Sequence, residues 1–251
     1  MYFFILFIII WGDITSSFIG ITSQSFNVIH NMRFGEIGVG DMNADGLWDV
    51  MLSGQSSQLN YNFFLYKQNA SLKFFDVTNG VTFPGGLPTG VIAGQLIFVD
   101  INRDGRMDLF YVGSGAAGSG VSSLYIQSNV SSSSSSPVFY NGSSSAFPLG
   151  LPQASTSYAD FGDYDNNNAL DLLLIGGNIP FFLFSQNASQ TTFANVASNS
   201  SFPTGLPAPN MSNSWTAWRD FDRDGKLDFV LIGNNSNYLF RQNATGVFYN
   251  V

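Results

Sequence analysis

The sequence predicts an all-β fold made of four repeated units, each with four short strands. The main observation is a nine-residue segment that begins at Asp41, Asp100, Asp163 and Asp220, so that the repeat period is about 60 residues. The second observation is a composition rich in Gly, Asn, Ser and Phe, which favours short strands and turns. The third is that no window shows a helical period. Repeated four-stranded units of this length are typical of the blades of a β-propeller.

Each unit contains four segments of strand length that are separated by polar turns. The first segment precedes the nonapeptide and the second follows it directly. The predicted second strands are Val50–Gly54, Leu109–Gly113, Leu172–Gly176 and Phe229–Gly233. The third are Phe63–Tyr66, Ser123–Ile126, Phe181–Phe184 and Tyr238–Arg241, and the fourth are Lys73–Val77, Val138–Tyr140, Thr192–Val196 and Val247–Val251. The nonapeptide therefore joins the first two strands of an antiparallel sheet. It lies on the same side of the unit as the turn between the third and fourth strands.

The repeat predicts one β-propeller domain over residues 18–251, with units at about 26–82, 83–146, 147–201 and 202–251. The later units begin with the related hexapeptides FPGGLP, FPLGLP and FPTGLP, which are Phe83–Pro88, Phe147–Pro152 and Phe202–Pro207. A serine run at 131–136 is predicted to be an insertion in the second unit.

The N-terminal residues 1–17 are predicted to be a signal peptide. Tyr2–Trp11 is an unbroken apolar run that is too short for a membrane-spanning helix but has the length of a signal-peptide core. Thr15, Ser16 and Ser17 then offer small residues for cleavage before Phe18. The alternatives are an uncleaved anchor and a wrongly assigned start. The first interpretation predicts a protein that is secreted or displayed at the cell surface, with the membrane involved only through this segment.

The charged residues are concentrated in the four nonapeptides. The formal net charge is −8, and 13 of the 17 acidic residues lie inside these loops, which leaves Asp13, Glu36, Asp76 and Asp160 outside them. Four divalent cations would cancel this charge, so cation sites explain the acidity better than a face for a basic partner. With nine Lys and Arg residues in total, no nucleic-acid interface is expected. The chain has no cysteine, which excludes disulfides and thiolate metal sites.

The nonapeptides have the chemistry of a hard-cation loop. They read DMNADGLWD, DINRDGRMD, DYDNNNALD and DFDRDGKLD, with oxygen-bearing side chains on alternate residues, a turn at position six and an Asp at position nine. An EF-hand would need an acidic residue at position twelve, which is Leu52, Tyr111, Leu174 or Leu231 here. The remaining alternative is a set of Asx turns that hold hairpins without a metal.

Two kinds of segment resemble known repeats. FGEIGVGDMNADGLWDVMLSG, at Phe34–Gly54, resembles the FG-GAP repeat of integrin α-chain propellers. The segments LYKQNASLKFFDV and LFRQNATGVFYNV are similar to the related VCBS repeats of secreted and surface proteins. This resemblance implies a calcium-stabilised propeller of the kind found in extracellular adhesion and recognition proteins. Complete propellers of that family generally have seven blades, so four recognisable units predict an incomplete or unusually small propeller.

The resemblance implies one Ca²⁺ for each loop, and up to four in the chain. The implied side-chain ligands are Asp41, Asn43, Asp45 and Asp49; Asp100, Asn102, Asp104 and Asp108; Asp163, Asp165, Asn167 and Asp171; and Asp220, Asp222, Asp224 and Asp228. The carbonyl oxygens of Leu47, Arg106, Ala169 and Lys226 are the expected additional ligands. The fourth loop, with four carboxylates, is expected to bind most tightly. The third, with Asn168 at the turn, is expected to bind most weakly.

The chain is predicted not to be an enzyme. His30 is the single histidine and there is no cysteine, so nucleophilic triads and histidine zinc sites lack their residues. We expect His30 to be an ordinary loop or core residue. A cation site that is saturated by protein oxygens has a structural role, because catalysis requires an open coordination position.

The predicted function is a calcium-stabilised extracellular binding module that recognises a protein partner through its loops, as in adhesion. The alternatives are a carbohydrate-binding, lectin-like propeller and a non-catalytic propeller part of a secreted enzyme. Exposed aromatic residues at equivalent positions of every unit would favour the lectin. Secretion in a eukaryote would predict a glycoprotein, and the N-x-[ST] sequons are at Asn69, Asn129, Asn141, Asn187, Asn199, Asn210, Asn234 and Asn243. Glycans near the calcium loops would leave the opposite side of the blades as the partner surface.

Overall fold

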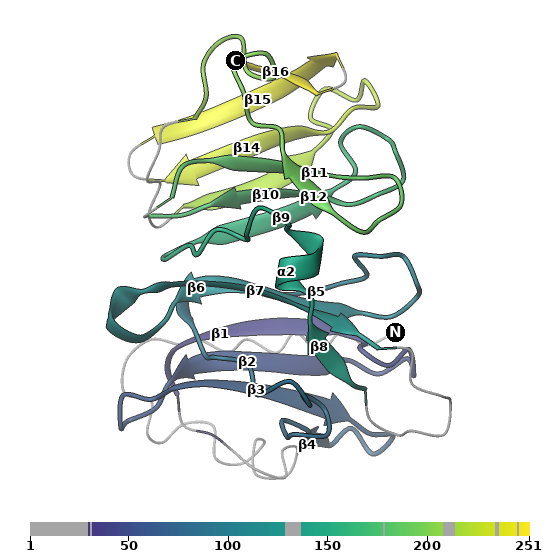
Figure 1. The fold of residues 1–251 in the computed structure, drawn as a ribbon, viewed down its shortest axis with the longest axis vertical. Helices are drawn as coiled ribbons and strands as arrows, with labels where there is room; N and C mark the ends of the chain where they lie inside the picture. The colour runs from purple at the N-terminus through teal and green to yellow at the C-terminus, as the bar shows by residue number, and fades with distance from the viewer. Residues whose placement is uncertain are drawn as a thin grey trace.

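The computed structural model describes residues 30, 32–128, 137–177, 179–207, 214–233, 236–244 and 246–251. They form four sheets of four strands each, which we call blades (Figure 1). The first blade contains β1 (Arg33–Gly40), β2 (Asp49–Gln55), β3 (Tyr61–Gln68) and β4 (Phe74–Asp76), and the second contains β5 (Ile92–Val99), β6 (Asp108–Ser114), β7 (Gly120–Gln127) and β8 (Phe139–Asn141). The third contains β9 (Tyr158–Gly162), β10 (Asp171–Ile175), β11 (Phe182–Gln186) and β12 (Phe193–Asn195), and the fourth contains β13 (Trp215–Arg219), β14 (Asp228–Gly233), β15 (Ser236–Ala244) and β16 (Val247–Asn250).

The predicted all-β fold is confirmed. Within the described ranges, the helical elements are the four-residue helix α2 (Ser143–Ala146) and the 3₁₀ turn η1 (Ala116–Gly118). None of the helices in this part of the chain is long and apolar enough to cross a membrane. The predicted signal peptide, the serine run and the sequons at Asn129, Asn210 and Asn234 lie outside the described residues.

Each blade is an antiparallel meander in which neighbouring strands follow one another in sequence. The ninth residue of each nonapeptide begins the second strand, opposite the last residue of the first strand. The pairs are Gly40 with Asp49, Val99 with Asp108, Gly162 with Asp171, and Arg219 with Asp228. The four nonapeptides are therefore equivalent hairpin loops, as the sequence predicts.

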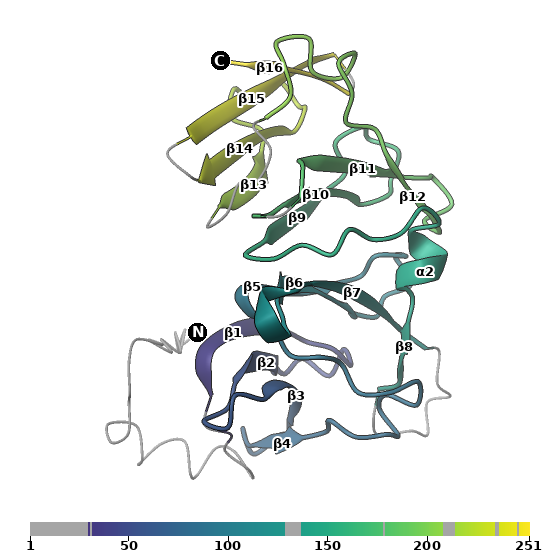
Figure 2. The same cartoon turned by 60° about the vertical axis from the view of Figure 1, so that its left-hand side comes forward.

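The blades stack in chain order to form an open array. Figures 1 and 2 both show the first blade at the bottom and the fourth at the top, with the second and third between them. The first strands of the first two blades, β1 and β5, approach each other closely. A Cβ atom added to Gly38 would lie 2.8 Å from the carbonyl oxygen of Leu96. The first and fourth blades lie at opposite ends of the stack, so the described residues do not close into a ring.

Apolar cores fill the spaces between successive blades. Alternate residues of a strand face opposite sides of its sheet. On the second strand of each of the first three blades, the side chains on the same side as the first Asp pack against the following blade. Between the first two blades the core includes Met51, Leu65, Leu96 and Tyr111; between the second and third it includes Phe110, Leu124, Leu172 and Phe184; between the last two it includes Leu173, Leu183, Phe229 and Phe240. Stability of one blade therefore depends on its neighbours.

The Phe that begins each FPxGLP hexapeptide is buried in the core. Phe83, Phe147 and Phe202 are at most 2% exposed. They stack on Phe139, Phe193 and Phe248 of the fourth strands, with ring centroids 5.6, 4.6 and 5.5 Å apart. The Phe of each hexapeptide therefore packs within the blade that follows it.

A side-chain acceptor on the first strand joins each blade to the next. Glu36 accepts a hydrogen bond from the Gly94 amide at 3.0 Å, and Gln95 accepts one from Ala159 at 2.9 Å. Asp160 accepts one from Trp218 at 2.7 Å. Glu36 and Gln95 occupy the same place, four residues before the residue that pairs with the loop Asp. Burial raises the pKa of Glu36 above its usual value, although the amides of Gly94 and Ala93 partly oppose this shift.

Replacing Glu36 with Gln is expected to raise the melting temperature at pH 7.5 by about 2–4 °C, the effect of about 1 kcal/mol in a protein of this size. The amide keeps the hydrogen bond, as Gln95 does, without burying a charge. The raised pKa means that the wild type is fully stabilised only below the unfolded pKa of Glu and loses stability as the pH rises through the folded pKa. The difference between variant and wild type should therefore disappear near pH 4. Gln95→Glu is the matched reverse variant and should melt lower at pH 7.5. Equal melting temperatures for Glu36→Gln and wild type at pH 7.5 would contradict this account.

Candidate metal centres in the repeated loops

The four loops have the same backbone conformation at their fourth and sixth residues. Their sixth residues have positive φ, which is 81° at Gly46, 82° at Gly105, 66° at Asn168 and 86° at Gly225. A positive φ at this position is the turn that the sequence predicts. Asn168 can adopt a positive φ because Asn enters the left-handed region more readily than most residues other than Gly. The fourth residues also have positive φ, which the sequence does not indicate, since they are Ala44, Arg103, Asn166 and Arg223.

The first Asp of each loop organises the turn. In the third loop the two oxygens of Asp163 accept hydrogen bonds from the amides of Asn167 and Asn168, both at 3.0 Å. The other loops repeat this pair of bonds, from residues five and six to Asp41, Asp100 and Asp220. The first carboxylate is thereby fixed with its oxygens at the centre of the loop.

The ninth Asp of each loop is buried and accepts two backbone hydrogen bonds. Asp49, Asp108 and Asp171 are 0% exposed and Asp228 is 1% exposed. One carboxylate oxygen accepts a hydrogen bond from the backbone N–H of the second loop residue. The other accepts one from the backbone N–H of a Gln on the third strand. These glutamines are Gln68, Gln127, Gln186 and Gln242. The sequence interpretation did not include them, although a Gln just before the sequon-bearing turn recurs in every unit.

Burial makes the charge on three of these carboxylates unfavourable. It raises the pKa of Asp49 to about 6 and those of Asp108 and Asp171 to about 7. The backbone amides lower each pKa in part, whereas the other carboxylates of the same loop raise it further. A divalent cation beside such a group would replace the proton and favour the ionised form.

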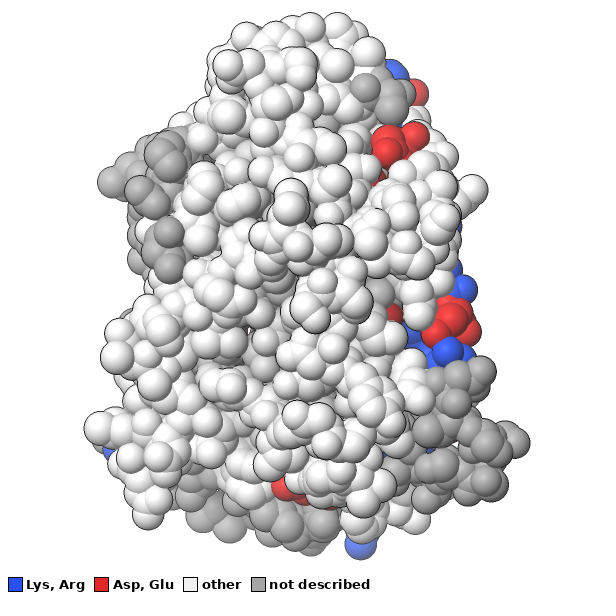
Figure 3. Space-filling view, viewed as in Figure 1, with Lys and Arg blue, Asp and Glu red and all other residues white. Residues whose placement is uncertain are grey.

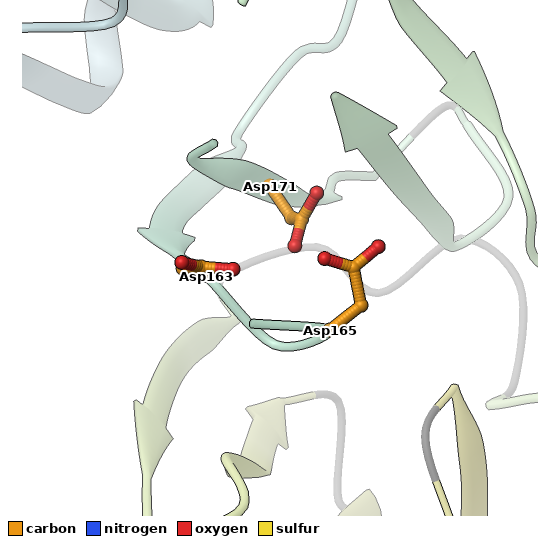
Figure 4. A group of neighbouring side chains, drawn as sticks. All are labelled: Asp163, Asp165 and Asp171. Atoms are coloured by element: carbon orange, nitrogen blue, oxygen red, sulfur yellow. The ribbon is translucent and has the colours of Figure 1, made fainter. Parts of the chain in front are cut away.

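The structure brings three carboxylates together in two of the loops. In the third loop one oxygen each of Asp163, Asp165 and Asp171 lies within 4.8 Å of the others, and Figure 4 shows the three groups around a common space. In the fourth loop the same holds for Asp220, Asp222 and Asp224. Loops one and two have Asn43 and Asn102 at the third position, and each of these donates its amide to the Asp at position five.

Basic side chains lie next to several loop carboxylates. Lys226 contacts Asp224 at 2.5 Å and Arg241 contacts Asp222, so two carboxylates of the fourth loop are in ion pairs. Arg103 of the second loop reaches Asp163 of the third at 3.5 Å. In Figure 3 most of the red and blue atoms lie along the right edge of the molecule, and most of the other described atoms on this face are white. The order of affinity among the loops stays a prediction.

The donor atoms fit a hard cation. All the predicted side-chain ligands offer oxygen, which suits calcium. The Asn43 side-chain oxygen is buried and has no hydrogen-bond partner among the described residues, so it is an acceptor that a cation could use. The amides of the seventh residues, Leu47, Arg106, Ala169 and Lys226, donate to the fifth side chain of their loops. The role of their carbonyl oxygens as ligands stays a prediction.

His30 and the turn asparagines have structural partners. His30 contacts Asp76 at 3.1 Å and stacks on Phe64, with ring centroids 3.6 Å apart, so it packs as an ordinary residue of the first blade. Asn69 and Asn187 accept backbone hydrogen bonds within the turns between the third and fourth strands. These asparagines are therefore turn residues, and their glycosylation stays a prediction.

A segment that begins at the first loop and ends within the second blade matches a known repeat. Residues 41–111, which include the first two loops, match the model of the FG-GAP-like repeat. The chain contains an FG-GAP-like repeat. This finding confirms the resemblance that the first loop and its flanks suggest. The third and fourth blades, outside the matched segment, have the same strand order and loop hydrogen bonds as the first two blades.

Among solved structures, the chain is similar to one described as showing the recognition of non-reducing terminal N-acetylglucosamine by an Agrocybe aegerita lectin. The two chains are 16% identical with a TM-score of 0.48, and the match covers 85% of this chain and 51% of the other. The chain thus spans about half the length of that structure. No curated protein matches the sequence.

Proposed function

We propose that the chain is a calcium-stabilised extracellular binding module that recognises a protein partner. The observation that carries this proposal is the repetition of one oxygen-lined loop, with the same buried Asp and the same backbone bonds, on all four blades. Calcium in each loop would hold the first hairpin of a blade closed. Such sites are structural, which leaves recognition to other surfaces of the blades.

The turns between the second and third strands are the proposed partner surface. They lie at the opposite ends of the strands from the calcium loops, because the strands are antiparallel. Leu59 in the first of these turns is 65% exposed, and the η1 turn in the second blade is exposed and uncharged. Loops on a rigid scaffold are the usual place for binding residues.

Glycan binding is the second candidate. A shallow hollow of about 330 Å³ lies between the first calcium loop and the β3–β4 turn, lined in part by Asp45, Lys67, Asn69 and Phe75. Phe75 is 40% exposed, and Tyr140 at the equivalent place on β8 is 50% exposed. An aromatic ring beside polar groups suits a sugar. Ala194 takes this place on β12, so the aromatic position is not repeated in every blade.

Binding of the labelled chain to cells, with calcium present, tests these functions. We expect binding that survives glycosidase treatment of the cells, disappears after protease treatment and weakens at least about 5-fold in Leu59→Ser, since exposed anchor residues dominate interfaces. Phe75→Ala is the matched control and should bind as the wild type does. Binding that is lost after glycosidase treatment and in Phe75→Ala would instead establish the glycan function. Absence of binding to any cell type would contradict both.

A further inference from the structure

A buried chain of hydrogen bonds connects the second calcium loop to the third. The backbone amide of Gln186 donates to Asp171 at 2.8 Å, and its side-chain oxygen accepts the amide of Leu170 at 3.0 Å. Its side-chain nitrogen crosses to the second blade and donates to the carbonyl of Ile101 at 3.1 Å. Ile101 is the second residue of its loop, and its amide donates to Asp108 at 3.1 Å. One glutamine therefore contacts residues of both predicted calcium loops.

The same connection recurs between the third and fourth loops. The amide of Gln242 donates to Asp228 at 2.8 Å, and its side-chain nitrogen donates to the carbonyl of Tyr164 at 3.2 Å. Tyr164 is the second residue of the third loop, and its amide donates to Asp171 at 3.0 Å. Asp171 is thus bound from both directions. The path runs without interruption from Asp108 to Asp228 across three blades.

Every group along this path is shielded from solvent. Asp108, Asp171 and Gln242 are 0% exposed, and Gln186 is 1% exposed. Tyr164, the most exposed member, is 5% exposed. Hydrogen bonds in such surroundings are strong and hold a defined geometry, so a displacement of one carboxylate changes the positions available to its neighbours.

We propose that loops two, three and four bind calcium cooperatively, and that Gln186 and Gln242 are the positioning residues that couple them. This inference rests on the proposed calcium binding. An ion that fixes Asp171 also orders Gln186 and, through it, the Ile101 end of the second loop. The second loop then loses less conformational freedom when its own ion binds, which is positive coupling between the sites. The coupling is reciprocal, so an ion in the second loop must favour the third equally.

Calcium titration by calorimetry of the whole chain and two variants tests the coupling. Gln186→Met removes both side-chain bonds but leaves the backbone amide that Asp171 accepts. Gln95→Met is the matched control, because Gln95 also joins the second and third blades by a side-chain bond, to Ala159, away from the loops. We expect the same number of ions in all three proteins. The Hill coefficient should exceed 1 in wild type and Gln95→Met and fall toward 1 in Gln186→Met, with about 5-fold or more weaker binding at the coupled sites.

The possible outcomes separate this inference from the proposed function. If the wild type binds no calcium, the calcium proposal itself fails and the coupling with it. If the wild type binds calcium and Gln186→Met gives an unchanged Hill coefficient, calcium binding stands and the coupling is wrong. Gln242→Met provides an independent variant at the next interface, should Gln186→Met not fold. An unchanged Hill coefficient in Gln242→Met overturns the coupling in the same way.

Discussion

Removal of calcium with a chelator is expected to lower the melting temperature of the chain by at least about 10 °C, because occupied sites stabilise the fold by mass action. One site contributes about 2.7 kcal/mol when free calcium is one hundred times its dissociation constant. In a protein of this size each kcal/mol changes the melting temperature by about 2–4 °C. Several occupied loops should therefore exceed 10 °C together.

Scanning calorimetry in chelator, and again after calcium is restored, measures this effect. The restored sample should melt where the untreated one does. Magnesium is the control ion, since it is smaller, demands octahedral geometry and should restore only part of the loss. The same melting curve with and without chelator would contradict the structural role of calcium.

Replacement of Phe147 with Ala is expected to destabilise the chain by about 3–5 kcal/mol, the usual loss for a buried Phe in a packed core. Phe147 is 2% exposed and stacks on Phe193 at 4.6 Å, with Phe184 in an edge contact at 5.2 Å. The ring fills the core between the second and third blades. Its loss leaves a cavity that the surrounding strands cannot readily close.

Leu149→Ala is the matched control for Phe147→Ala. Leu149 lies two residues later in the same hexapeptide and is 97% exposed. Its replacement should change the free energy of unfolding by less than about 0.5 kcal/mol, as is usual for surface positions. Both values come from urea unfolding of the two variants and the wild type. A Phe147→Ala protein as stable as Leu149→Ala would show that the hexapeptide is only a surface connection.

The hairpin loops could be predicted from the sequence because their chemistry is local. The alternation of oxygen side chains, the residue tolerant of positive φ and the ninth Asp all lie within nine residues, from Asp163 to Asp171 in the third copy. The strands on either side follow from their apolar residues. The FPxGLP motif could be recognised in the sequence as the start of a unit. The burial of its Phe between blades could not be predicted, since a Phe in a turn-rich segment gives no sign that it fills a core.

The contacts between blades could not be predicted from one sequence. Gln186 bonds to a residue 85 positions away and Gln242 to one 78 positions away, and no local pattern specifies such a partner. Glu36 and Asp160 reach the next blade across 58 residues each. Whether the array closes depends on the twist and tilt between blades. These are set by side-chain packing over three interfaces rather than by any one motif.

A count of bound calcium ions by native mass spectrometry tests the central claim most directly. We expect four ions in the calcium-loaded chain, one in each loop. Asp220→Ala should bind one ion fewer, because it removes the carboxylate that organises the fourth loop, where Asp224 and Gly225 donate their amides to Asp220. A chain that retains no calcium, or an Asp220→Ala protein with the same number of ions as the wild type, would contradict the assignment of these loops as calcium sites.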